Sequence, residues 1–485
     1  MPIKVSIIGA GSLGFTRGIV RDILCVPELQ DTVFAFTDID PRYLDMVYRL
    51  CRRDLEAAGL PAKISATTNR REALQDANYV FSVVRVGGLE AFATDIDIPL
   101  KYGVDQCVGD TLCAGGIMYA QRTIPVLLDF CQDIRDVSAP DCLFINHSNP
   151  MAMNMWAVNE DGGGVRNVGL CHGVEGGHKQ IAEVLNLPLE EVDIICAGIN
   201  HQTWYISVKH KGEDMTGRLL EAFERHPVYS KTEKVRIDIL RRFGYYGTES
   251  NGHLSEYVPW YRKRPEEIPE WIDLSHWIHG ETGGYLRVCT ENRNWFEEEF
   301  PTLMEGPTLR FRREDRGREH GSYIIESLET GRIYRGHFNV PNDGCITNLP
   351  EDAVVEVPGY VDGNGLNIPR VGDLPPGCAA ICNASIDVQR LAMEAAVNGD
   401  DVLLRQAMMM DPLTGAVCNP REIWQMVDEM LVAGEKWLPQ YRQAISEAKR
   451  RLASGDLIPT KDYRGAARLR VRTPEELAAE RRRTA

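Results

Sequence analysis

The chain has 485 residues, 44% of them hydrophobic and 26% charged, which is an ordinary composition for a globular protein with a large core. Its formal net charge of -16 disfavours nucleic acid and anionic membranes as partners, because both are negatively charged. No run approaches the roughly 18 apolar residues of a membrane helix, the N-terminus does not resemble a signal peptide, and the 13 cysteines are scattered singly. We therefore expect a cytoplasmic protein without a disulfide framework that binds a small neutral molecule.

The first two hundred residues alternate short β-branched runs with longer helical patterns. The predicted strands are KVSIIGA, TVFAFTDID, YVFSVVRVGG, CLFINHS and VRNVGLCHG, and the predicted helices lie at 13–29, 41–59 and near 117–135. Strands interleaved with helices indicate right-handed crossovers and a parallel sheet covered on both faces. The sequence thus predicts an α/β fold that begins with a Rossmann-like, doubly wound domain.

The pattern changes from about Leu189. The expected features are one or two strands at 193–212, charged helices at 214–300, an exposed loop or flap at 301–321, strands at 335–360 and helices at 385–450. We expect three regions: residues 1–198 as a dinucleotide-binding domain, 199–463 as a mixed α+β domain for substrate, metal and oligomerisation, and 464–485 as a charged, solvated extension.

A glycine-rich turn follows the first predicted strand. In the run Gly9-Ala10-Gly11-Ser12-Leu13-Gly14, Gly9 permits a tight turn and Gly11 lets the backbone approach a pyrophosphate, which the N-terminus of the next helix attracts. Asp38 ends the second strand, where its carboxylate can bind a ribose diol and would repel a 2′-phosphate. The sequence predicts NAD bound by Gly9, Gly11, Ser12, Gly14 and Asp38, against the alternative of a turn kept for packing alone.

Cys171 and His201 each follow a predicted strand, at the sheet edge where open α/β folds bind ligands. A thiolate and an imidazole would form an incomplete ligand set with open positions, which suits Mn, Co, Ni or Fe(II) more than closed structural zinc. The spacing alone equally fits a buried thiol and a core histidine.

Two polar clusters complete the candidates. Asn149 follows the predicted strand CLFINHS and can point its amide toward the cofactor or a hydroxylated ligand, although an Asn-Pro turn needs no ligand. The segment 245–257 is dense in acids, histidine and hydroxyl groups, as exposed loops also are, and 109–116 is expected to be a flexible loop beside the cleft.

Together these blocks resemble glycoside hydrolase family 4, most closely its melibiase-type α-galactosidase branch. The matching stretches are GAGSLGF, TDID, GDTLCAGGIMYAQRTIP, NPMAMNMWA, GLCHG, AGINH, GYYGTESNGHLSEYVPW, NVPNDGCITNLPEDAVVEVP and MMMDPLTGAV. They occur in a consistent order through most of the chain, so the resemblance is specific.

The resemblance implies an α-glycosidase that is an NAD-dependent exception to paired-carboxylate hydrolysis. The expected route is oxidation at sugar C3, elimination across C1 and C2, addition of water, and re-reduction at C3. A divalent metal, with Mn preferred, would stabilise the enediolate. The expected partner is a small α-glycoside, and a homodimer or homotetramer is the expected assembly.

Residue roles carried over by motif follow from the same resemblance. Cys171 and His201 match the metal ligands, and Asn149 matches a substrate-binding asparagine. His172 stands where a related branch has an aspartic general acid, so a histidine would protonate the leaving oxygen here. For the base at C2 we prefer Glu249, with Tyr246 as the second choice, because this branch departs from the tyrosine of the phosphoglycosidases.

Two departures affect the expectation. Cys113-Ala114 stands where many relatives have Gly-Pro, and no clear phosphate pocket is visible, although Arg312, Arg313 and Arg316 lie in the predicted flap. An unphosphorylated glycoside is therefore the expected substrate. An α-glucosidase or α-galacturonidase of the same family, a plain NAD-dependent sugar or hydroxy-acid dehydrogenase, and a non-enzymatic NAD sensor remain the alternatives.

Overall fold

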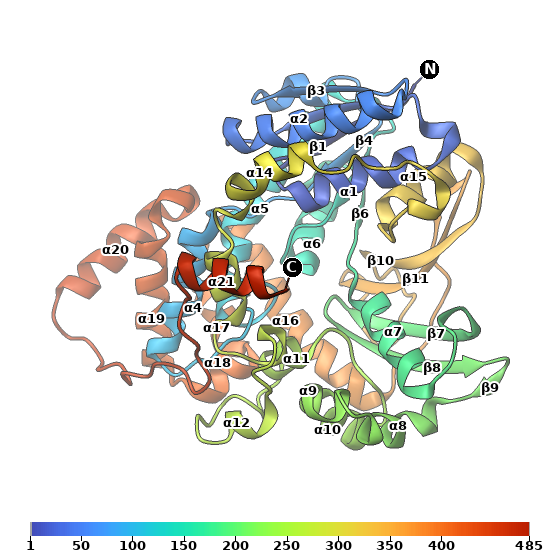
Figure 1. Ribbon diagram of the computed structural model, residues 1–485. Coiled ribbons are helices and arrows are strands. Elements are labelled where there is room, and N and C mark those ends of the chain that lie inside the picture. Colours follow the sequence, from blue (N-terminus) through green and yellow to red (C-terminus); the bar gives the residue numbers. More distant parts are fainter. Residues whose placement is uncertain (1, 485) are drawn as a thin grey trace.

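A computed structural model describes residues 2–484 and shows one mixed sheet wrapped by helices (Figure 1). Six parallel strands form its first half in the order β3-β2-β1-β4-β5-β6. They are β1 (Lys4–Ile8), β2 (Val33–Thr37), β3 (Lys63–Thr67), β4 (Tyr79–Ser82), β5 (Leu143–Asn146) and β6 (Arg166–Gly169). This strand order is that of a Rossmann fold, so the predicted doubly wound sheet is confirmed.

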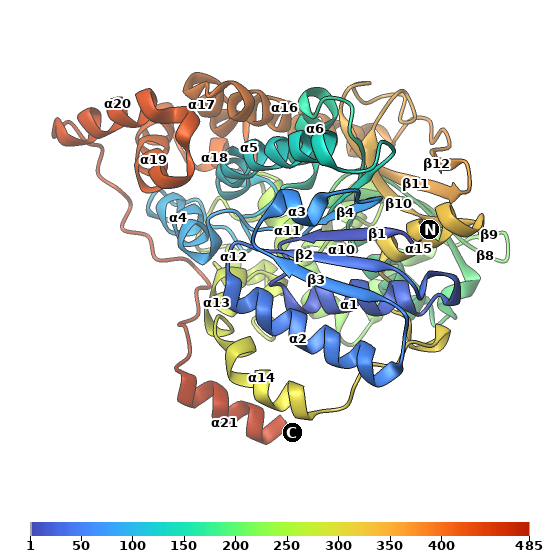
Figure 2. The same ribbon diagram turned by 90° about the horizontal axis from the view of Figure 1, so that it is seen from above.

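Helices cover both faces of this half. Figure 2 shows α1 and α2 on one face and α5 and α6 on the other. The helices of this half are α1 (Leu13–Leu24), α2 (Pro41–Ala58), α3 (Arg70–Leu74), α4 (Gly88–Lys101), α5 (Cys113–Val137) and α6 (Met151–Asp161). The start of α2 is marked by Asp40, whose side chain accepts from the N–H groups of Arg42 and Tyr43, and its end by Gly59 with φ of 63°.

The sheet continues without a break into the second half. Strand β6 pairs antiparallel with β10 (Tyr334–Pro341), which is followed by β11 (Val354–Asp362), β7 (Val192–Ile199), β8 (Gln202–His210) and β9 (Glu213–Asp214), and β12 (Gly365–Asn367) pairs with β11. The strands expected at 193–212 and 335–360 are thus present. Residue 198, the expected domain boundary, lies at the end of β7, inside this shared sheet.

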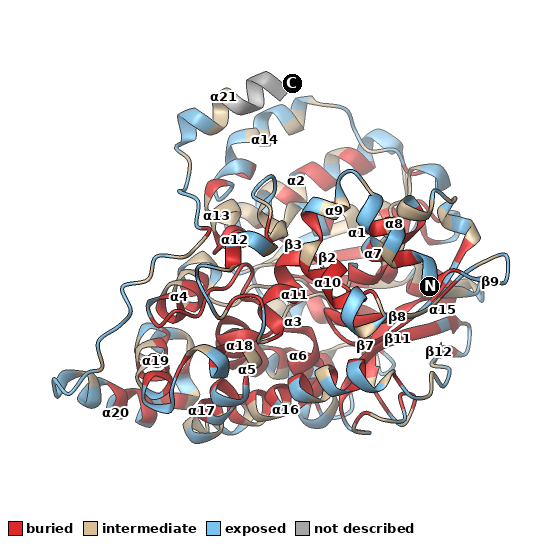
Figure 3. Ribbon diagram, turned by 90° about the horizontal axis from the view of Figure 1, so that it is seen from below, coloured by how far each residue is buried: buried red, intermediate tan, exposed pale blue. Residues whose placement is uncertain are grey.

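The remaining helices surround the second half. They are α7 (Gly173–Leu185), α8 (Leu219–Arg225), α9 (Tyr229–Thr232), α10 (Lys234–Phe243), α11 (Asn251–Tyr257), α12 (Ile268–Trp271), α13 (Gly284–Glu291), α14 (Trp295–Glu305), α15 (His320–Thr330), α16 (Pro376–Asn398), α17 (Asp401–Met410), α18 (Pro412–Val417), α19 (Pro420–Ala433), α20 (Arg442–Ala453) and α21 (Pro474–Thr484). Figure 3 shows buried residues along the sheet and in α6 and α11, and a mostly exposed α14. Within residues 2–484, no helix is long and apolar enough to cross a bilayer.

Two expected segments differ from the structure. The loop expected at 301–321 begins inside α14 and ends in α15, so the irregular part is 306–319 with one short 3-10 turn. The tail, expected to be solvated from 464 onward, is tied to the body because the Ala466 N–H donates to Asp105 and Arg472 pairs with Glu291. Sequence reasoning missed these contacts because their partners lie far away in the chain.

Candidate active site

Cys171 and His201 lie side by side at the junction of the two halves of the sheet. Cys171 follows the carboxyl end of β6, and His201 occupies the turn between β7 and β8 with φ of 62°. The distance from Cys171 Sγ to His201 Nε2 is 3.2 Å. The structure therefore brings together the two residues that the sequence proposed as metal ligands.

The other ring nitrogen of His201 is held by hydroxyl groups. Thr111 Oγ1 lies 3.0 Å from His201 Nδ1, and the Tyr257 hydroxyl lies 3.4 Å from the same atom. Such contacts orient an imidazole and leave its opposite nitrogen to a ligand. His201 thus presents Nε2 toward Cys171.

Two sets of side chains around His201 have the spacing of metal ligands in the part of the chain that is described. Cys171, His201 and Glu249 offer one ligand atom each within 4.8 Å of one another, and so do Asp110, His201 and His253. Sulfur, nitrogen and carboxylate oxygen together suit a divalent transition metal. The residues present thus fit the metal that the sequence predicted.

Burial sets the protonation states of the possible metal ligands. Burial, with the nearby Glu356 and Glu249 carboxyls, raises the pKa of the Cys171 thiol well above its usual range. Burial also lowers the pKa of His253 to about 4. A neutral imidazole is ready to bind a metal, whereas this thiol needs a cation beside it to lose its proton.

Glu249 is half-buried beside the two ligands. Burial works to raise the pKa of its carboxyl, but the combined effect of His201, His253 and Arg236 outweighs burial, and the pKa is lowered. Glu249 is therefore a carboxylate near neutral pH. Tyr246 differs, because it is fully buried, its hydroxyl donates to Gln180 at 3.0 Å, and its ring stacks on Phe223.

The glycine-rich turn predicted to bind the dinucleotide is tight, and its glycines leave no room for side chains at Gly9 and Gly11. Gly9 has φ of 86°, and a Cβ there would lie 2.6 Å from the Val83 carbonyl oxygen. The Gly11 N–H donates to Asp38 at 2.8 Å. Ser12 precedes α1 without a side-chain cap, so the first N–H groups of that helix are not capped by it and can receive a phosphate. Gly14 has open space around it.

Gly11 carries a constraint that the sequence did not reveal. A Cβ at Gly11 would lie 2.9 Å from Asp38 Oδ2, so the close approach of Asp38 already requires a glycine here. Asp38 also accepts from the Asp40 N–H. The Asp38 carboxylate is therefore anchored at the end of β2, where a ribose would meet it.

Asn149 lies at the edge of the ligand sets, before a cis peptide bond to Pro150. Its amide nitrogen donates to Asp110 at 3.4 Å, and Arg85 pairs with the same carboxylate at 3.3 Å. The loop 109–116, expected to be flexible, is buried, and Glu256 accepts from the N–H of Gly109. Asp110 thus faces the site from a fixed loop.

His172 forms the N-terminal cap position of α7, and its side chain is half exposed. Its Nε2 lies 3.0 Å from Glu319 Oε2, and this hydrogen bond raises the pKa of the imidazole despite partial burial. His172 and Glu319 line one hollow of about 380 Å³ together with Gly14 and Phe15. The predicted acid and the dinucleotide turn therefore open into the same space.

Three arginines of the predicted flap form ion pairs with acidic side chains. Arg312 pairs with Asp315, Arg313 with Glu28 and Glu326, and Arg316 with Glu326. These ion pairs neutralise three of the arginines that a sugar phosphate could bind, whereas Arg318 lines the hollow beside His172.

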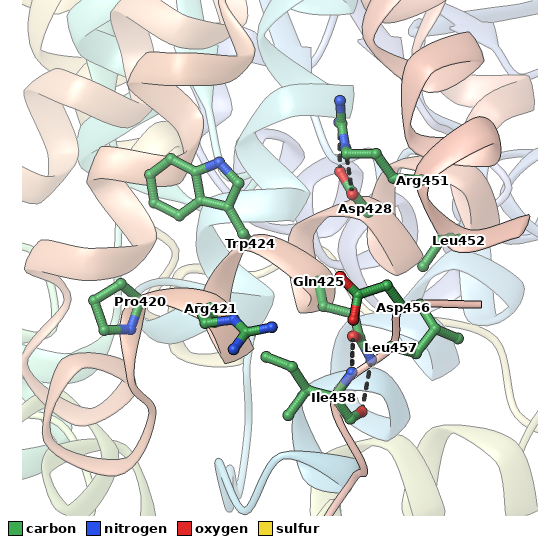
Figure 4. A pocket seen from close by; sticks show the side chains of 10 residues that line it. All are labelled: Pro420, Arg421, Trp424, Gln425, Asp428, Arg451, Leu452, Asp456, Leu457 and Ile458. Carbon is green, nitrogen blue, oxygen red and sulfur yellow. Dashed lines mark hydrogen bonds and ion pairs between the residues drawn. The ribbon is translucent and has the colours of Figure 1, made fainter. Parts of the chain in front are cut away.

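Another hollow, of about 390 Å³, lies between α19 and α20 (Figure 4). Trp424 and Leu457 form part of its wall, and Asp428 and Arg451 pair with each other there. The residues lining it include none of the predicted site residues. The candidate site is therefore the one at Cys171.

Comparison with known proteins places this geometry in a family. Residues 4–187 match the family 4 glycosyl hydrolase model, and residues 196–414 match the model of the family 4 glycosyl hydrolase C-terminal domain. The chain belongs to the family 4 glycosyl hydrolases. The predicted resemblance is thereby confirmed.

Individual relatives align with nearly the whole length of this family 4 glycosyl hydrolase. An α-galactosidase of Rhizobium meliloti (strain 1021) is 58% identical over 479 residues, covering 99% of this chain and 97% of the relative. An α-galactosidase of Bacillus subtilis (strain 168) is 34% identical, covering 90% of this chain and 100% of the relative. A 6-phospho-α-glucosidase from gut microorganisms, solved with NAD and glucose-6-phosphate, has a TM-score of 0.73 and 26% identity, covering 90% and 99%.

Sequence reasoning missed several residues of this site. The missed residues are Asp110 and His253, which form a possible ligand set with His201, and Glu319, which contacts His172. His253 lies in the polar segment 245–257 that the sequence singled out, so its signal was present. Asp110 and Glu319 come from loops without periodicity, and only the fold shows where they point.

Proposed function

We propose that the enzyme is an α-galactosidase that uses NAD and a divalent metal, most suitably Mn, at the Cys171 site. The observation that carries the proposal is the meeting of Cys171, His201 and Glu249 within ligand distance of one another at the sheet edge that also bears the dinucleotide turn. The 58% identity to an α-galactosidase supports the choice of sugar.

Cys171 and His201 would hold the metal, and the turn at Gly9 to Gly14, together with Asp38, would hold NAD. When bound, NAD would supply a reversible hydride acceptor, and the metal would supply positive charge to stabilise an enediolate. The steps that remain to the chain are binding, proton removal at C2 and proton delivery to the leaving oxygen.

Glu249 suits the removal of the C2 proton. It is a carboxylate beside the ligand pair, and its pKa is lowered because His201, His253 and Arg236 together outweigh burial, so it can accept a proton once the sugar is oxidised at C3. Tyr246 donates its hydroxyl to Gln180 inside a hydrophobic cluster, which makes it the weaker candidate. Glu249 is therefore the proposed base.

His172 and Asn149 suit the remaining tasks. His172 is half exposed at the helix N-terminus, shares its hollow with the dinucleotide turn, and has a raised pKa that favours the protonated ring. It can protonate the departing oxygen at C1. Asn149 lies against Asp110, where its amide can donate to a sugar hydroxyl.

The site favours a sugar without a phosphate. Arg85 is neutralised by Asp110, and Arg312, Arg313 and Arg316 pair with acids of their own. A phosphorylated sugar would have to break such pairs before it gained any of its own. The proposed substrate class is therefore an unphosphorylated α-galactoside.

The decisive experiment follows the hydrogen at C2. An α-galactoside deuterated at C2 is turned over with NAD, Mn and a thiol reductant, and the galactose formed is analysed for the label. We expect cleavage with loss of deuterium to solvent and no net rise in NADH absorbance. Retention of the label would contradict elimination across C1 and C2, and NADH formed in proportion to product would indicate a dehydrogenase.

We also propose that the enzyme acts in the cytoplasm as a homo-oligomer. All 13 cysteines are free thiols, and free thiols and NAD both suit a reducing compartment. Exposed Trp424, Met409 and Met410 on α17 and α19 offer apolar surface for a second copy. Light scattering of the purified enzyme tests the assembly, and a monomeric mass would contradict it.

A further inference from the structure

The carboxylate of Glu319 connects the proposed proton donor, His172, to the irregular segment 306–319. Glu319 ends segment 306–319 and precedes α15 as its N-cap. Its Oε2 lies 3.0 Å from His172 Nε2, and its Oε1 lies 3.5 Å from His147 Nε2. Each carboxylate oxygen therefore faces one histidine.

Glu319 is fixed more firmly than the histidine it contacts. Its side chain is 12% exposed, whereas that of His172 is 50% exposed. The preceding residues are anchored, because the Gly317 N–H donates to Asp22 on α1 at 2.8 Å and its carbonyl accepts from Tyr323. Glu319 is thus the less exposed partner of the pair, and the chain before it is held to α1.

The remaining contacts of Glu319 keep it charged and in place. Burial works against ionisation, but His147 and the hydrogen bond from His172 outweigh it and lower the pKa of Glu319 to about 2. His147 is buried, and its ring stacks on Phe81 with 5.9 Å between ring centroids. The charged carboxylate therefore has a fixed partner on one oxygen and His172 on the other.

A half-exposed histidine at a helix N-terminus would otherwise sample several side-chain rotamers. A carboxylate that accepts from one ring nitrogen selects a rotamer and a tautomer, as the aspartate does in serine protease triads. With Nε2 engaged by Glu319, Nδ1 is the nitrogen left to face a substrate.

We infer that Glu319 is a positioning residue for departure of the aglycone, one that holds the ring of His172 so that Nδ1 meets the leaving oxygen. This inference rests on the proposed role of His172. Through Glu319, segment 306–319 would take part in the reaction. The same segment is held to α1 through Gly317.

The test compares two leaving groups on the full-length enzyme with NAD and Mn present. An α-galactosyl disaccharide has a basic alkoxide leaving group that needs protonation, whereas nitrophenolate leaves without help. For Glu319→Gln we expect kcat/KM to fall about 10- to 100-fold with the disaccharide and less than about threefold with nitrophenyl α-galactoside. Glu319→Asp should restore part of the loss.

Matched variants separate positioning from folding. Glu329→Gln changes another carboxylate of α15, which accepts a hydrogen bond from Tyr79. This variant should keep its kcat/KM with both substrates. In a His172→Ala background, Glu319→Gln should cause little further loss, because the two residues act as one unit.

The outcomes that overturn the inference are distinct. Equal loss with both substrates would show a structural role for Glu319, and no loss with either would show no role. If His172→Ala loses kcat/KM selectively with the disaccharide but Glu319→Gln does not, only the role of Glu319 is overturned. If His172→Ala itself shows no selectivity for the leaving group, the acid in the proposed function fails, and the role of Glu319 fails with it.

Discussion

Cys171 Sγ and His201 Nε2 lie 3.2 Å apart although they follow different strands of the sheet. Strands β10 and β11 lie between β6 and β7 in the sheet, and pairing of Asn339 with Gly169 and of Glu356 with Gly198 aligns the ends of the two strands. The antiparallel half of the sheet therefore brings the thiol and the imidazole together.

Substitution Cys171→Ser should remove metal-dependent activity. The hydroxyl of serine is a poor ligand for a soft site, so we expect turnover to fall by at least about 100-fold, while NAD affinity stays within about threefold. Metal content and NAD titration would be measured on the same preparation. Cys345→Ser is the control, because this thiol contacts Asn342 and lies outside the ligand sets. Full activity of Cys171→Ser with bound metal would refute the assignment.

Substitution Asp38→Ala should weaken NAD binding and narrow the preference for NAD over NADP. The carboxylate holds the Gly11 N–H and faces the position of the ribose, so its loss should cost roughly 10- to 100-fold in NAD affinity. NADP should lose less, because the repulsion of its 2′-phosphate also disappears. Calorimetric titration with both cofactors measures the ratio. Asp45→Ala, an exposed change on α2, serves as the control. An unchanged ratio would assign Asp38 to the turn alone.

Glu249→Gln should impair catalysis, whereas Tyr246→Phe should impair only stability. Glu249→Gln removes the proposed base, so turnover and deuterium exchange at C2 should both fall by about 100-fold or more. Tyr246→Phe removes a buried hydrogen bond to Gln180 and should lower the unfolding temperature while leaving exchange intact. Exchange measured with both variants decides between them. Loss of exchange in Tyr246→Phe at unchanged metal content would reverse the assignment.

The fold was predictable where buried residues gather in short runs. Strands β1, β2, β4 and β5 each carry at least four buried residues, and the glycine turn marks the first crossover. Strand β3 escaped prediction because it lies at the sheet edge and no residue of it is fully buried. Helix α4 was not predicted either. Hydrophobic periodicity detects cores and is weak at edges.

The site was predictable only in part, for a related reason. Cys171 and His201 were found because they end strands, and Asn149 because it follows one. Asp110 and Glu319 come from irregular loops whose direction is set by distant partners, such as Glu256 on α11 and Asp22 on α1. Residues placed by long-range contacts leave no local pattern in the sequence.

Glu256 leads to a prediction about stability and pH. It is fully buried, and it accepts the N–H groups of Cys107, Val108 and Gly109 at 2.6, 3.0 and 2.9 Å. Burial raises the pKa of its carboxyl to about 7 from the usual 4.5, and the three N–H groups only partly oppose the rise. In the folded chain the carboxyl therefore keeps its proton at a pH where the unfolded chain has lost it.

The sign of the effect follows from proton binding. Because the folded state binds the proton more tightly, the stability that Glu256 contributes is fully present below pH 4.5 and is lost as the pH rises through about 7. Glutamine cannot ionise, so the free energy of unfolding of the wild type should fall relative to Glu256→Gln by roughly 2 to 3 kcal/mol between pH 5 and 8. Urea unfolding of both proteins at the two pH values measures this difference. Other titrating groups affect both proteins alike. If the wild type instead becomes more stable than the variant as the pH rises, the three N–H groups outweigh burial and Glu256 is ionised in the folded chain.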